Sequence, residues 1–338
     1  MRSRWSLVVV VLELAAIGAV VACTTRPSAT STGRTINTAL GRAAIQRFFA
    51  DVRSAVLPTF DGDALPVPWD LPFRSDEHRR AWESHLATIT PRLHALDDLH
   101  EDPDVQGLLL IGDGKPVLEG PVKMYEMSHL TLELCASAQL ALDRGDLDAA
   151  MRRVEQVFEV VLAHRDPGKQ GHFYSSVHST RAVLRTETLT NHPRWDARRA
   201  YSGLAPRLRA LVDDQVAYLH GWTSIGRRVE YSKRALQDGY TVSSALDGAE
   251  REESRVEHTI AMERTLLLAF AADAFRAEHG RWPANTHELA PLVSAAELRT
   301  PLVPEPMDLA PEGPNLRVGL IHSKRPANEL GTTRLLVR

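Results

Sequence analysis

Apolar residues recur at helical spacing over most of the chain. Between residues 36 and 57 they stand three or four positions apart, which predicts an amphipathic helix that ends at Pro58. Ser75 can cap a second helix, whose apolar positions run from Trp82 to Leu96. Three further helices are expected, over residues 175–190, 195–219 and 226–236. Because helix follows helix with short breaks, the pattern predicts an irregular α-helical bundle.

The clearest pair of helices lies between residues 124 and 165. One helix runs to about Leu142, a turn follows at Gly145, and Asp146 can cap the second helix, so an αα-hairpin is expected. Residues 140–150 resemble the middle of a tetratricopeptide repeat. No second copy follows at the spacing of about 34 residues that such an array needs. We therefore expect a single repeat-like hairpin inside a larger bundle.

The pattern changes near residue 249. A long helix, for which Gly280 is a good C-terminal cap, precedes a short helix with Asn285 and Glu288 at capping-box spacing. Residues 316–321 and 333–337 then read as two strands of a β-hairpin. The sequence thus predicts a helical domain over 36–248 and a small α+β unit over 249–338. A second small hairpin is expected at residues 108–118, where apolar runs flank Gly-Asp-Gly.

The N-terminal segment has the pattern of an export signal. Arg2 and Arg4 precede an apolar run over residues 7–22, and Cys23 follows. Glu13 interrupts the run at a cost of roughly 2.5–3.5 kcal/mol. Ten Leu, Ile and Val residues offset that cost with roughly 0.3–0.6 kcal/mol each. The run is shorter than the roughly 20 residues that suit a transmembrane helix, so a signal is favoured over a permanent span.

Residues 20–23, Val-Val-Ala-Cys, resemble the lipobox of bacterial lipoproteins. The resemblance implies that Cys23 receives a diacylglycerol and becomes the mature N-terminus; a plain signal and an uncleaved anchor are the alternatives. Residues 24–35, rich in Thr and Ser, read as a flexible tether. The expected location is the bacterial cell envelope, with residues 1–23 as signal and lipobox and the mature chain anchored outside the cytoplasm.

Composition narrows the classes of partner and cofactor. A formal net charge of −3 over 338 residues gives no global field for nucleic acid, and no nucleic-acid partner is expected. Two cysteines are too few for a disulfide framework or a cysteine-based zinc site, and Cys135 reads as a small buried hydrophobe. Residues 181–234 hold eleven Lys and Arg against five acids, which reads as a solvated helical surface or a contact for anionic lipid.

Residues 275–283, Phe-Arg-Ala-Glu-His-Gly-Arg-Trp-Pro, followed by His-Glu-Leu at 287–289, resemble the post-helix segment of type II secretion pseudopilins. In that family a helix ends in a Gly-Arg-aromatic-Pro turn, and a Leu-containing helix and strands follow. Here no prepilin-peptidase site precedes the unit, and residues 304–307 replace the usual Asp-Pro-aromatic-Gly segment. The whole mature chain is similar to uncharacterised exported helical proteins of planctomycete-like bacteria. This similarity implies a mainly helical architecture and a location outside the cytoplasm.

Metal ligands are sparse at the spacings that metal sites use. Glu126 and His129 have the Glu-x-x-His spacing of di-iron bundles, but the second pair is missing, and Asp97 with His100 is a poor substitute in a charged, solvated stretch. A loose calcium-loop pattern has Leu110 at its ninth position and too few oxygen ligands. Its residues are Asp102, Asp104, Gln106, Gly107 and Asp113. We expect no metal and no cofactor, and interpret this stretch as an acidic helix end before a buried strand.

Catalytic motifs are also incomplete. His287-Glu288 lacks the second histidine of a zinc-protease helix, and residues 112–116 lack the remaining positions of a phosphate loop. Ser175, Ser176 and His178 are near in sequence without an orienting acid. No catalytic residue is therefore assigned.

Three roles stay open. The leading one is a non-catalytic, envelope-tethered helical scaffold that binds an envelope protein. The second is an accessory component of a secretion or pilus-like apparatus. The third is a hydrolase-like enzyme of unrecognised type, with the His-rich stretch over 164–178 as its site.

Overall fold

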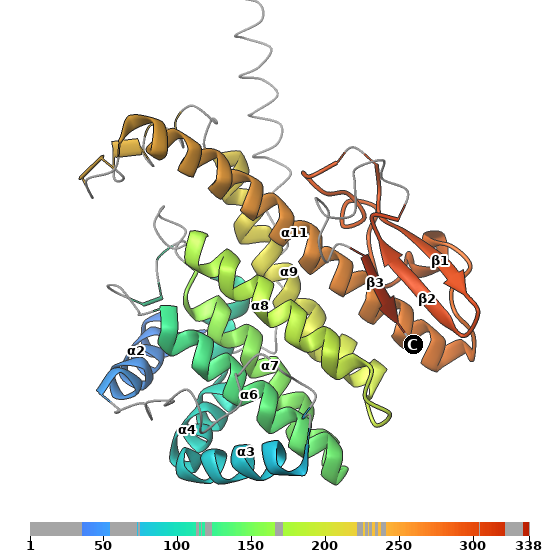
Figure 1. The fold of residues 1–338 in the computed structure, drawn as a ribbon, viewed down its shortest axis with the longest axis horizontal. Coiled ribbons are helices and arrows are strands. Elements are labelled where there is room, and N and C mark those ends of the chain that lie inside the picture. Colours follow the sequence, from blue (N-terminus) through green and yellow to red (C-terminus); the bar gives the residue numbers. More distant parts are fainter. Residues whose placement is uncertain are drawn as a thin grey trace, which may run out of the picture. The chain divides into compact units, whose positions relative to one another are not determined.

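A computed structural model places most of the chain beyond its N-terminal segment (Figure 1). It describes residues 36–54, 73, 75–112, 115, 117–118, 124–165, 172–221, 226, 229, 232–233, 236–237, 241–303, 305–321 and 334–337. Residues 37–338 cluster as one compact unit. The described part is mainly α-helical with a small sheet near the C-terminus, which confirms the predicted fold class. The boundary near residue 249 stays a prediction.

The described part of the first half of the unit consists mainly of helices. They are α2 (Thr38–Ser54), α3 (Asp76–Thr88), α4 (Thr90–Glu101), α5 (Pro103–Ile111), α6 (Met124–Arg144) and α7 (Leu147–Ala163). The second half has three long helices, α8 (His172–Thr190), α9 (Ala197–Gly221) and α11 (Val242–His279). Helix α11 packs along α9 and α8, and α7 packs against α6 and α9. One buried apolar cluster runs from Ile45 on α2 to Val337 at the end of the chain.

The predicted αα-hairpin is confirmed in α6 and α7. Gly145 has φ +80° in the turn, a conformation that glycine adopts at little cost. Asp146 caps α7, because its Oδ1 accepts a hydrogen bond from the Ala149 amide at 3.0 Å. Val154, Phe158 and Val161 form the buried face of α7. The turn and the apolar periodicity were sufficient to predict this element.

The helix predicted to run from Ser75 to Leu96 is in fact two helices. Ser75 caps α3 as expected, with its Oγ accepting from the His78 amide at 3.1 Å. The helix then ends at Ile89, and α4 begins with Pro91 in its first turn. Proline has no amide hydrogen and its ring clashes with the preceding turn, so it favours the start of a helix over its interior.

The hairpin predicted at residues 108–118 is wrong in its first strand. Residues 108–111 form the end of α5, which begins at Pro103 with Asp102 as its cap. Leu108 and Leu109 are buried between helices. Because every residue from 108 to 111 is apolar, the run shows no helical period in the sequence and was interpreted as a strand. The Asp-Pro pair was the overlooked signal for a helix start.

The C-terminal elements follow the predicted order. Gly280, with φ +71°, ends α11, and its amide donates to the Arg276 carbonyl at 2.8 Å. Asn285 caps a short 3₁₀ helix, η1 (Thr286–Leu289), through a 3.0 Å hydrogen bond from the His287 amide. The capping box is incomplete, because Glu288 accepts from the Ala284 amide instead of the amide of Asn285.

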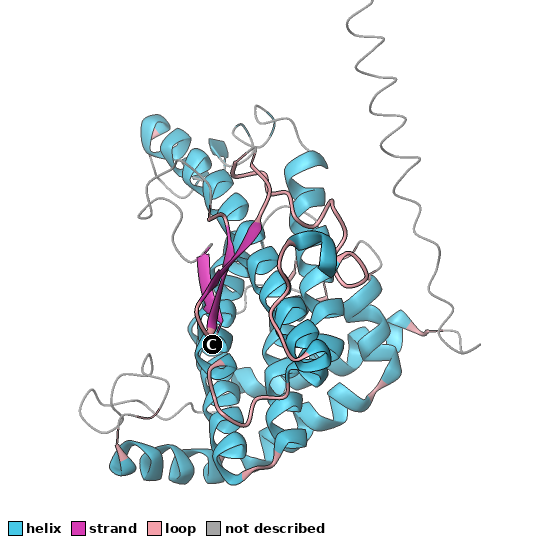
Figure 2. Ribbon diagram, turned by 90° about the vertical axis from the view of Figure 1, so that its right-hand side faces the viewer, coloured by secondary structure: helices cyan, strands magenta, loops and turns pink. Residues whose placement is uncertain are grey.

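The sheet has three antiparallel strands where two were predicted: β1 (Asp308–Glu312), β2 (Asn315–Gly319) and β3 (Arg334–Val337), in the order β1-β2-β3. Leu309 faces Val318 across the first pair, and Val318 faces Leu335 across the second. The sheet lies against α11 (Figure 2). Strand β1 is at the edge, where Pro311 is tolerated because only one side of the strand needs amide donors. That proline concealed the strand in the sequence.

Helix α2 approaches α5 so closely that only glycine fits at position 41. A Cβ on Gly41 would lie 2.5 Å from the Asp104 carbonyl oxygen. Replacing Gly41 by alanine is therefore expected to lower the free energy of unfolding by about 1–3 kcal/mol in urea unfolding, through overpacking. Helix propensity alone predicts a gain of about 1 kcal/mol, so a more stable variant would contradict the packing. The control Leu40→Ala changes an exposed neighbour and should stay within about 0.5 kcal/mol of the parent.

The signal, the lipobox and the tether, residues 1–35, fall outside the described residues, and so does the predicted helix end at Pro58. Among the helices that are described, none has both the length and the apolar run needed to cross a membrane.

Candidate functional site

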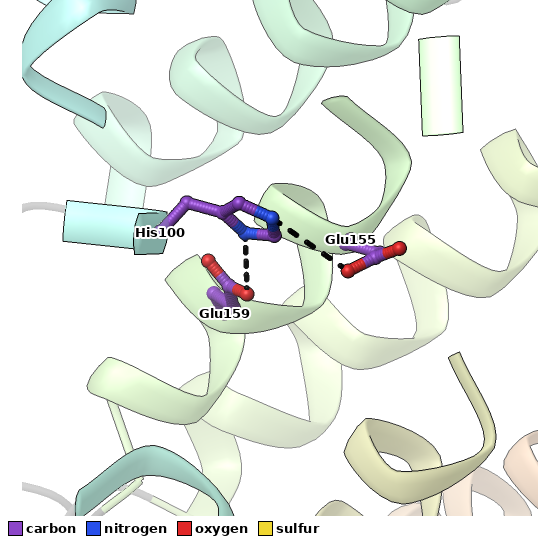
Figure 3. Close-up of side chains that lie close together, drawn as sticks. All are labelled: His100, Glu155 and Glu159. Atoms are coloured by element: carbon purple, nitrogen blue, oxygen red, sulfur yellow. Dashed lines mark hydrogen bonds and ion pairs between the residues drawn. The ribbon is translucent and has the colours of Figure 1, made fainter. Parts of the chain in front are cut away.

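Three helices bring ionisable side chains together inside the bundle. His100 lies in the last turn of α4, Glu155 and Glu159 lie on α7, and Arg207 lies on α9. The two glutamates are four residues apart and so project from the same face of α7. That face points toward α4 and α9, and Figure 3 shows His100 reaching over from α4 between the two carboxylates. We call these four residues the interior charge cluster.

Histidine 100 contacts both carboxylates. Its Nδ1 lies 2.9 Å from Glu159 Oε1, and its Nε2 lies 3.8 Å from Glu155 Oε2 (Figure 3). Both ring nitrogens thus face a carboxylate oxygen. Its side chain is 18% exposed, so these contacts lie at the margin of the buried core.

Arginine 207 completes the cluster from the side of α9. Its Nε donates to Glu159 Oε1 at 2.9 Å, and its Nη2 contacts Glu159 Oε1 and lies 3.1 Å from Glu155 Oε2. The same Nη2 donates to Gln106 Oε1 on α5 at 3.0 Å, and Nη1 donates to the Gly203 carbonyl at 2.6 Å. One buried guanidinium therefore ties α5, α7 and α9 together.

The pKa values of the two glutamates shift in opposite directions. Burial opposes the charge of Glu159, but the hydrogen bond from His100 and the charge of Arg207 outweigh it, so the pKa of Glu159 falls below its ordinary value. Burial dominates at Glu155 and raises the pKa of that carboxyl, although Arg207 and His100 oppose the shift. The surroundings thus favour the charged form of Glu159 more than that of Glu155.

His100, Glu155 and Glu159 are also the described residues that best match a metal site, because one ligand atom from each lies within 4.8 Å of the others. A cation at their centre would have to displace Arg207, which already contacts both carboxylates. Its guanidinium supplies the positive charge that two buried carboxylates require. The donor set therefore fits an ion-pair cluster better than a metal centre.

The space beside the cluster is too small for a substrate. The cavity that reaches Glu159 has a volume of about 20 Å³ and is otherwise lined by apolar side chains of α2, α4, α5 and α7. A single water needs roughly 10–15 Å³ measured in this way. The cavity thus holds about one water, and the chemistry available to the cluster is structural: it pairs charges between helices.

Two similar networks flank the cluster. Asp97 on α4 accepts two hydrogen bonds from Arg153 on α7, at 2.6 and 3.0 Å, and a third from Gln156 at 3.0 Å. In the second network, Glu133 of α6 lies 2.8 Å from His85 Nε2 and 3.2 Å from Arg92 Nη1. Each network joins a helix of the α3–α4 pair to the α6–α7 hairpin.

A further buried carboxyl lies between α8, α9 and α11. Glu263 Oε1 accepts hydrogen bonds from Ser179 and from Gln215 Nε2, the latter at 3.0 Å. Burial raises the pKa of Glu263 to about 8, against the two hydrogen bonds. Glu263 Oε2 and Gln215 Oε1 have no hydrogen-bond partner among the described residues. In the neutral carboxyl, a proton on Oε2 makes that oxygen a donor, while Oε1 still accepts from Ser179 and Gln215.

The residues that were considered as metal ligands and set aside have other partners in the structure. Asp97 and His100 are only partly exposed and pair with α7, so their assignment to a solvated stretch is wrong. His129 is buried, where desolvation lowers its pKa against the charge of Glu133. The side chain of Glu126 is outside the described part.

The residues of the calcium-loop pattern serve the start of α5 instead of an ion. Asp102 accepts from the amide of Asp104, Asp104 accepts from the Asn37 amide at 2.9 Å, and Gln106 accepts from Arg207. The stretch is thus an acidic helix start, and the strand expected after it is the end of α5. Asp113 is not described.

The other candidates divide between the buried core and the undescribed side chains. Cys135 is buried, as predicted, and burial raises its pKa to about 11. The basic stretch is not simply a solvated surface, because Arg185 and Arg207 are buried. Side chains at the start of α8 are outside the described part, including those of His172, Ser175, Ser176 and His178.

Sequence reasoning missed Glu155, Glu159 and Arg207. The two glutamates had one signal, since they stand at i and i+4 on the helix face that also carries Gln156 and other buried positions. Arg207 had none, because its carboxylate partners lie 48 or more residues away on another helix.

Together these features define a mainly helical protein with charge pairs between its helices and a small C-terminal sheet. Comparison with protein-family models, curated proteins and solved structures finds no match to this chain.

Proposed function

We propose that the protein is a non-catalytic helical scaffold, tethered in the bacterial cell envelope by its N-terminal segment, that binds another envelope protein. The observation that carries the proposal is how the buried ionisable groups are used. The carboxylates of Glu159, Asp97 and Glu133 each form an ion pair with an arginine of a neighbouring helix. The cavity beside Glu159 has room for about one water. In an enzyme, ionisable groups of this kind would surround a substrate. In this protein they pair with one another and join the helices.

The tethered location rests on the export pattern and on Cys23 in the lipobox-like tetrapeptide. In cell fractionation we expect the protein in the membrane fraction and the Cys23→Ser variant released from it or left with an uncleaved signal. Cys135→Ser is the matched control, because it removes the other cysteine from a buried position and should leave the fractionation unchanged. A full-length, unlipidated product that is soluble in the cytoplasm would contradict the location.

The binding role is tested by site-specific photo-crosslinking in intact cells. Leu40 and Ile111 are large apolar side chains that are 60% and 58% exposed, so a crosslinker there samples the surface without opening the core. We expect one envelope protein to recur at one of these positions. A crosslinker at Arg80, an exposed position on α3, is the matched polar control. Crosslinks to lipid alone, from every position, would remove the binding role.

A second candidate function is an accessory part in a secretion or pilus-like apparatus. It is supported by the order of the C-terminal elements, in which α11, the Gly280–Pro283 turn and η1 precede an antiparallel sheet. Arg317 lies on the exposed face of the central strand β2. Crosslinks from Arg317 to pilus or secretion components, and not from Leu40 or Ile111, would favour this role over the general scaffold.

A further inference from the structure

An open pocket lies where the end of α11 meets the start of α9. Its volume is about 520 Å³, within the range of small-molecule sites and far larger than the cavity beside Glu159. The loop between α8 and α9 and the first turn of α9 form one wall, and the last turns of α11 form the other. The interior charge cluster contributes no residue to it.

Three arginines line this pocket, Arg194 and Arg198 from the first wall and Arg276 from α11. Arg198 Nη2 donates to the Ala277 carbonyl at 3.0 Å, and Arg194 Nη1 donates to the Asp143 carbonyl at 3.3 Å. The guanidinium of Arg276 makes no hydrogen bond or ion pair within the described part, and its carbon lies 4.4 Å from the centre of the Trp282 ring. Since each guanidinium has five N–H donors, most of the donors in the pocket remain available.

Two carboxylates also line the pocket but do not neutralise it. Asp196 caps α9, with its Oδ1 accepting from the Arg199 amide at 3.0 Å. Asp273 is largely buried, and burial raises its pKa to about 6 although Arg276 opposes the shift. The three arginines therefore outnumber the two acids of the pocket. Of these acids, Asp196 is engaged as a helix cap, and burial disfavours the charged form of Asp273.

The wall of the pocket also offers an apolar surface. Trp195 lines it and stacks on Phe270, with ring centres 6.0 Å apart and planes 24° from parallel. The indole Nε1–H of Trp195 is buried and has no acceptor among the described residues. Buried donors without an acceptor are rare and often mark the place of a missing ligand or water. A ligand with an organic part and acceptor oxygens fits this wall.

We propose that the pocket binds a phosphate ester, with the phosphate held by Arg194, Arg198 and Arg276 and the organic part resting against Trp195. A phosphate has three terminal oxygens and up to two negative charges, which match several guanidiniums better than the two oxygens of a carboxylate do. A free phosphate ester and a phospholipid headgroup share this chemistry. The site is independent of the proposed scaffold role.

Isothermal titration of the full chain in a non-ionic detergent tests the proposal, with phenyl phosphate as the probe. We expect saturable binding that Arg276→Gln weakens about tenfold or more, as the loss of a charge-assisted contact does. Arg80→Gln is the matched control, since Arg80 is an exposed helical arginine whose Nε donates only to the Asp76 carbonyl. It should bind as the parent does. Thermal unfolding of both variants checks that each remains folded.

Two comparisons define the ligand class. Benzoate has the same ring with a carboxylate, and it should bind more weakly than phenyl phosphate; equal or tighter binding of benzoate would overturn the phosphate assignment. Glycerol phosphate and a short-chain, soluble phosphatidic acid separate the two sources: tighter binding of the lipid assigns a headgroup, and equal binding assigns a free ester. Absence of binding by all three phosphates, or an Arg276→Gln variant equal to the parent, would overturn the site.

Discussion

Replacing Arg207 by methionine is expected to lower the free energy of unfolding by about 3–5 kcal/mol, the range measured when one partner of a buried ion pair is removed. Arg207 is 7% exposed and contacts both carboxylates of α7. Methionine keeps much of the apolar stem but leaves Glu159 without the guanidinium that contacts it. The carboxylate must then stay charged in a poorly solvated position or take up a proton, and both options cost free energy.

Urea unfolding near neutral pH measures this effect, with Arg80→Met as the control. Arg80 is exposed, so its replacement should change the free energy of unfolding by no more than about 0.5 kcal/mol. Adding Glu159→Gln to Arg207→Met should recover part of the loss, because it removes the uncompensated charge. A loss below about 1 kcal/mol in the single variant would show that the cluster is solvated and does not hold the helices together.

Replacing Glu263 by glutamine is expected to make the protein more stable than its parent at alkaline pH and to have little such effect in acid. The pKa of Glu263 is raised to about 8 in the folded chain, from an ordinary value of 4.5. Between these two pH values the unfolded chain releases a proton that the folded chain keeps. The stability of the parent therefore falls as pH rises through this window, while the glutamine variant has no such loss.

The size of the effect follows from the shift, at about 1.4 kcal/mol for each unit of pKa. The advantage of Glu263→Gln over the parent should grow by about 3–5 kcal/mol from pH 4.5 to slightly above pH 8, with most of the growth inside that window. Urea unfolding at a series of pH values measures it. Glu278→Gln, which changes an exposed carboxylate of the same helix, should follow the parent throughout. A constant difference would mean that Glu263 is charged inside the fold.

Ser179 and Gln215 explain why a carboxyl persists at this position. Both donate to Glu263 Oε1, so a neutral carboxyl or an amide satisfies them, whereas an apolar replacement would leave two buried donors without an acceptor. Glutamine keeps the shape and the accepting oxygen. The comparison of Glu263→Gln with the parent therefore measures the effect of the carboxyl proton without a loss of packing.

Local signals identified most of the individual helices. The predicted N-caps Ser75 and Asp146 begin helices, and Gly280, which has no side chain, ends one. These signals could be read from the sequence because a cap depends on residues only three or four positions away. The failures have local causes too. Pro91 divides the helix that apolar spacing joined, and the apolar run at residues 108–111 has no period that separates a buried helix from a strand.

The interior charge cluster was beyond these signals. His100 was interpreted together with Asp97, its neighbour in sequence, yet each residue pairs with a different position on α7. The i and i+4 spacing of Glu155 and Glu159 defines a helix face but not what that face meets. The pairing with Arg207 needs α9 to lie beside α7, and this packing is decided by apolar contacts spread over the whole core.

By itself, the sequence determined that this protein is mainly helical, where most helices begin and end, and that a small sheet follows the longest helix. These properties depend on periodicity and capping, which act over a few residues. Only the tertiary structure decided which charges are buried together, that a third strand joins the sheet, and that three arginines line one pocket. The reason is physical: burial and charge pairing depend on side chains that are close in space, and the fold brings together residues as far apart in sequence as Glu159 and Arg207, which are separated by 48 residues.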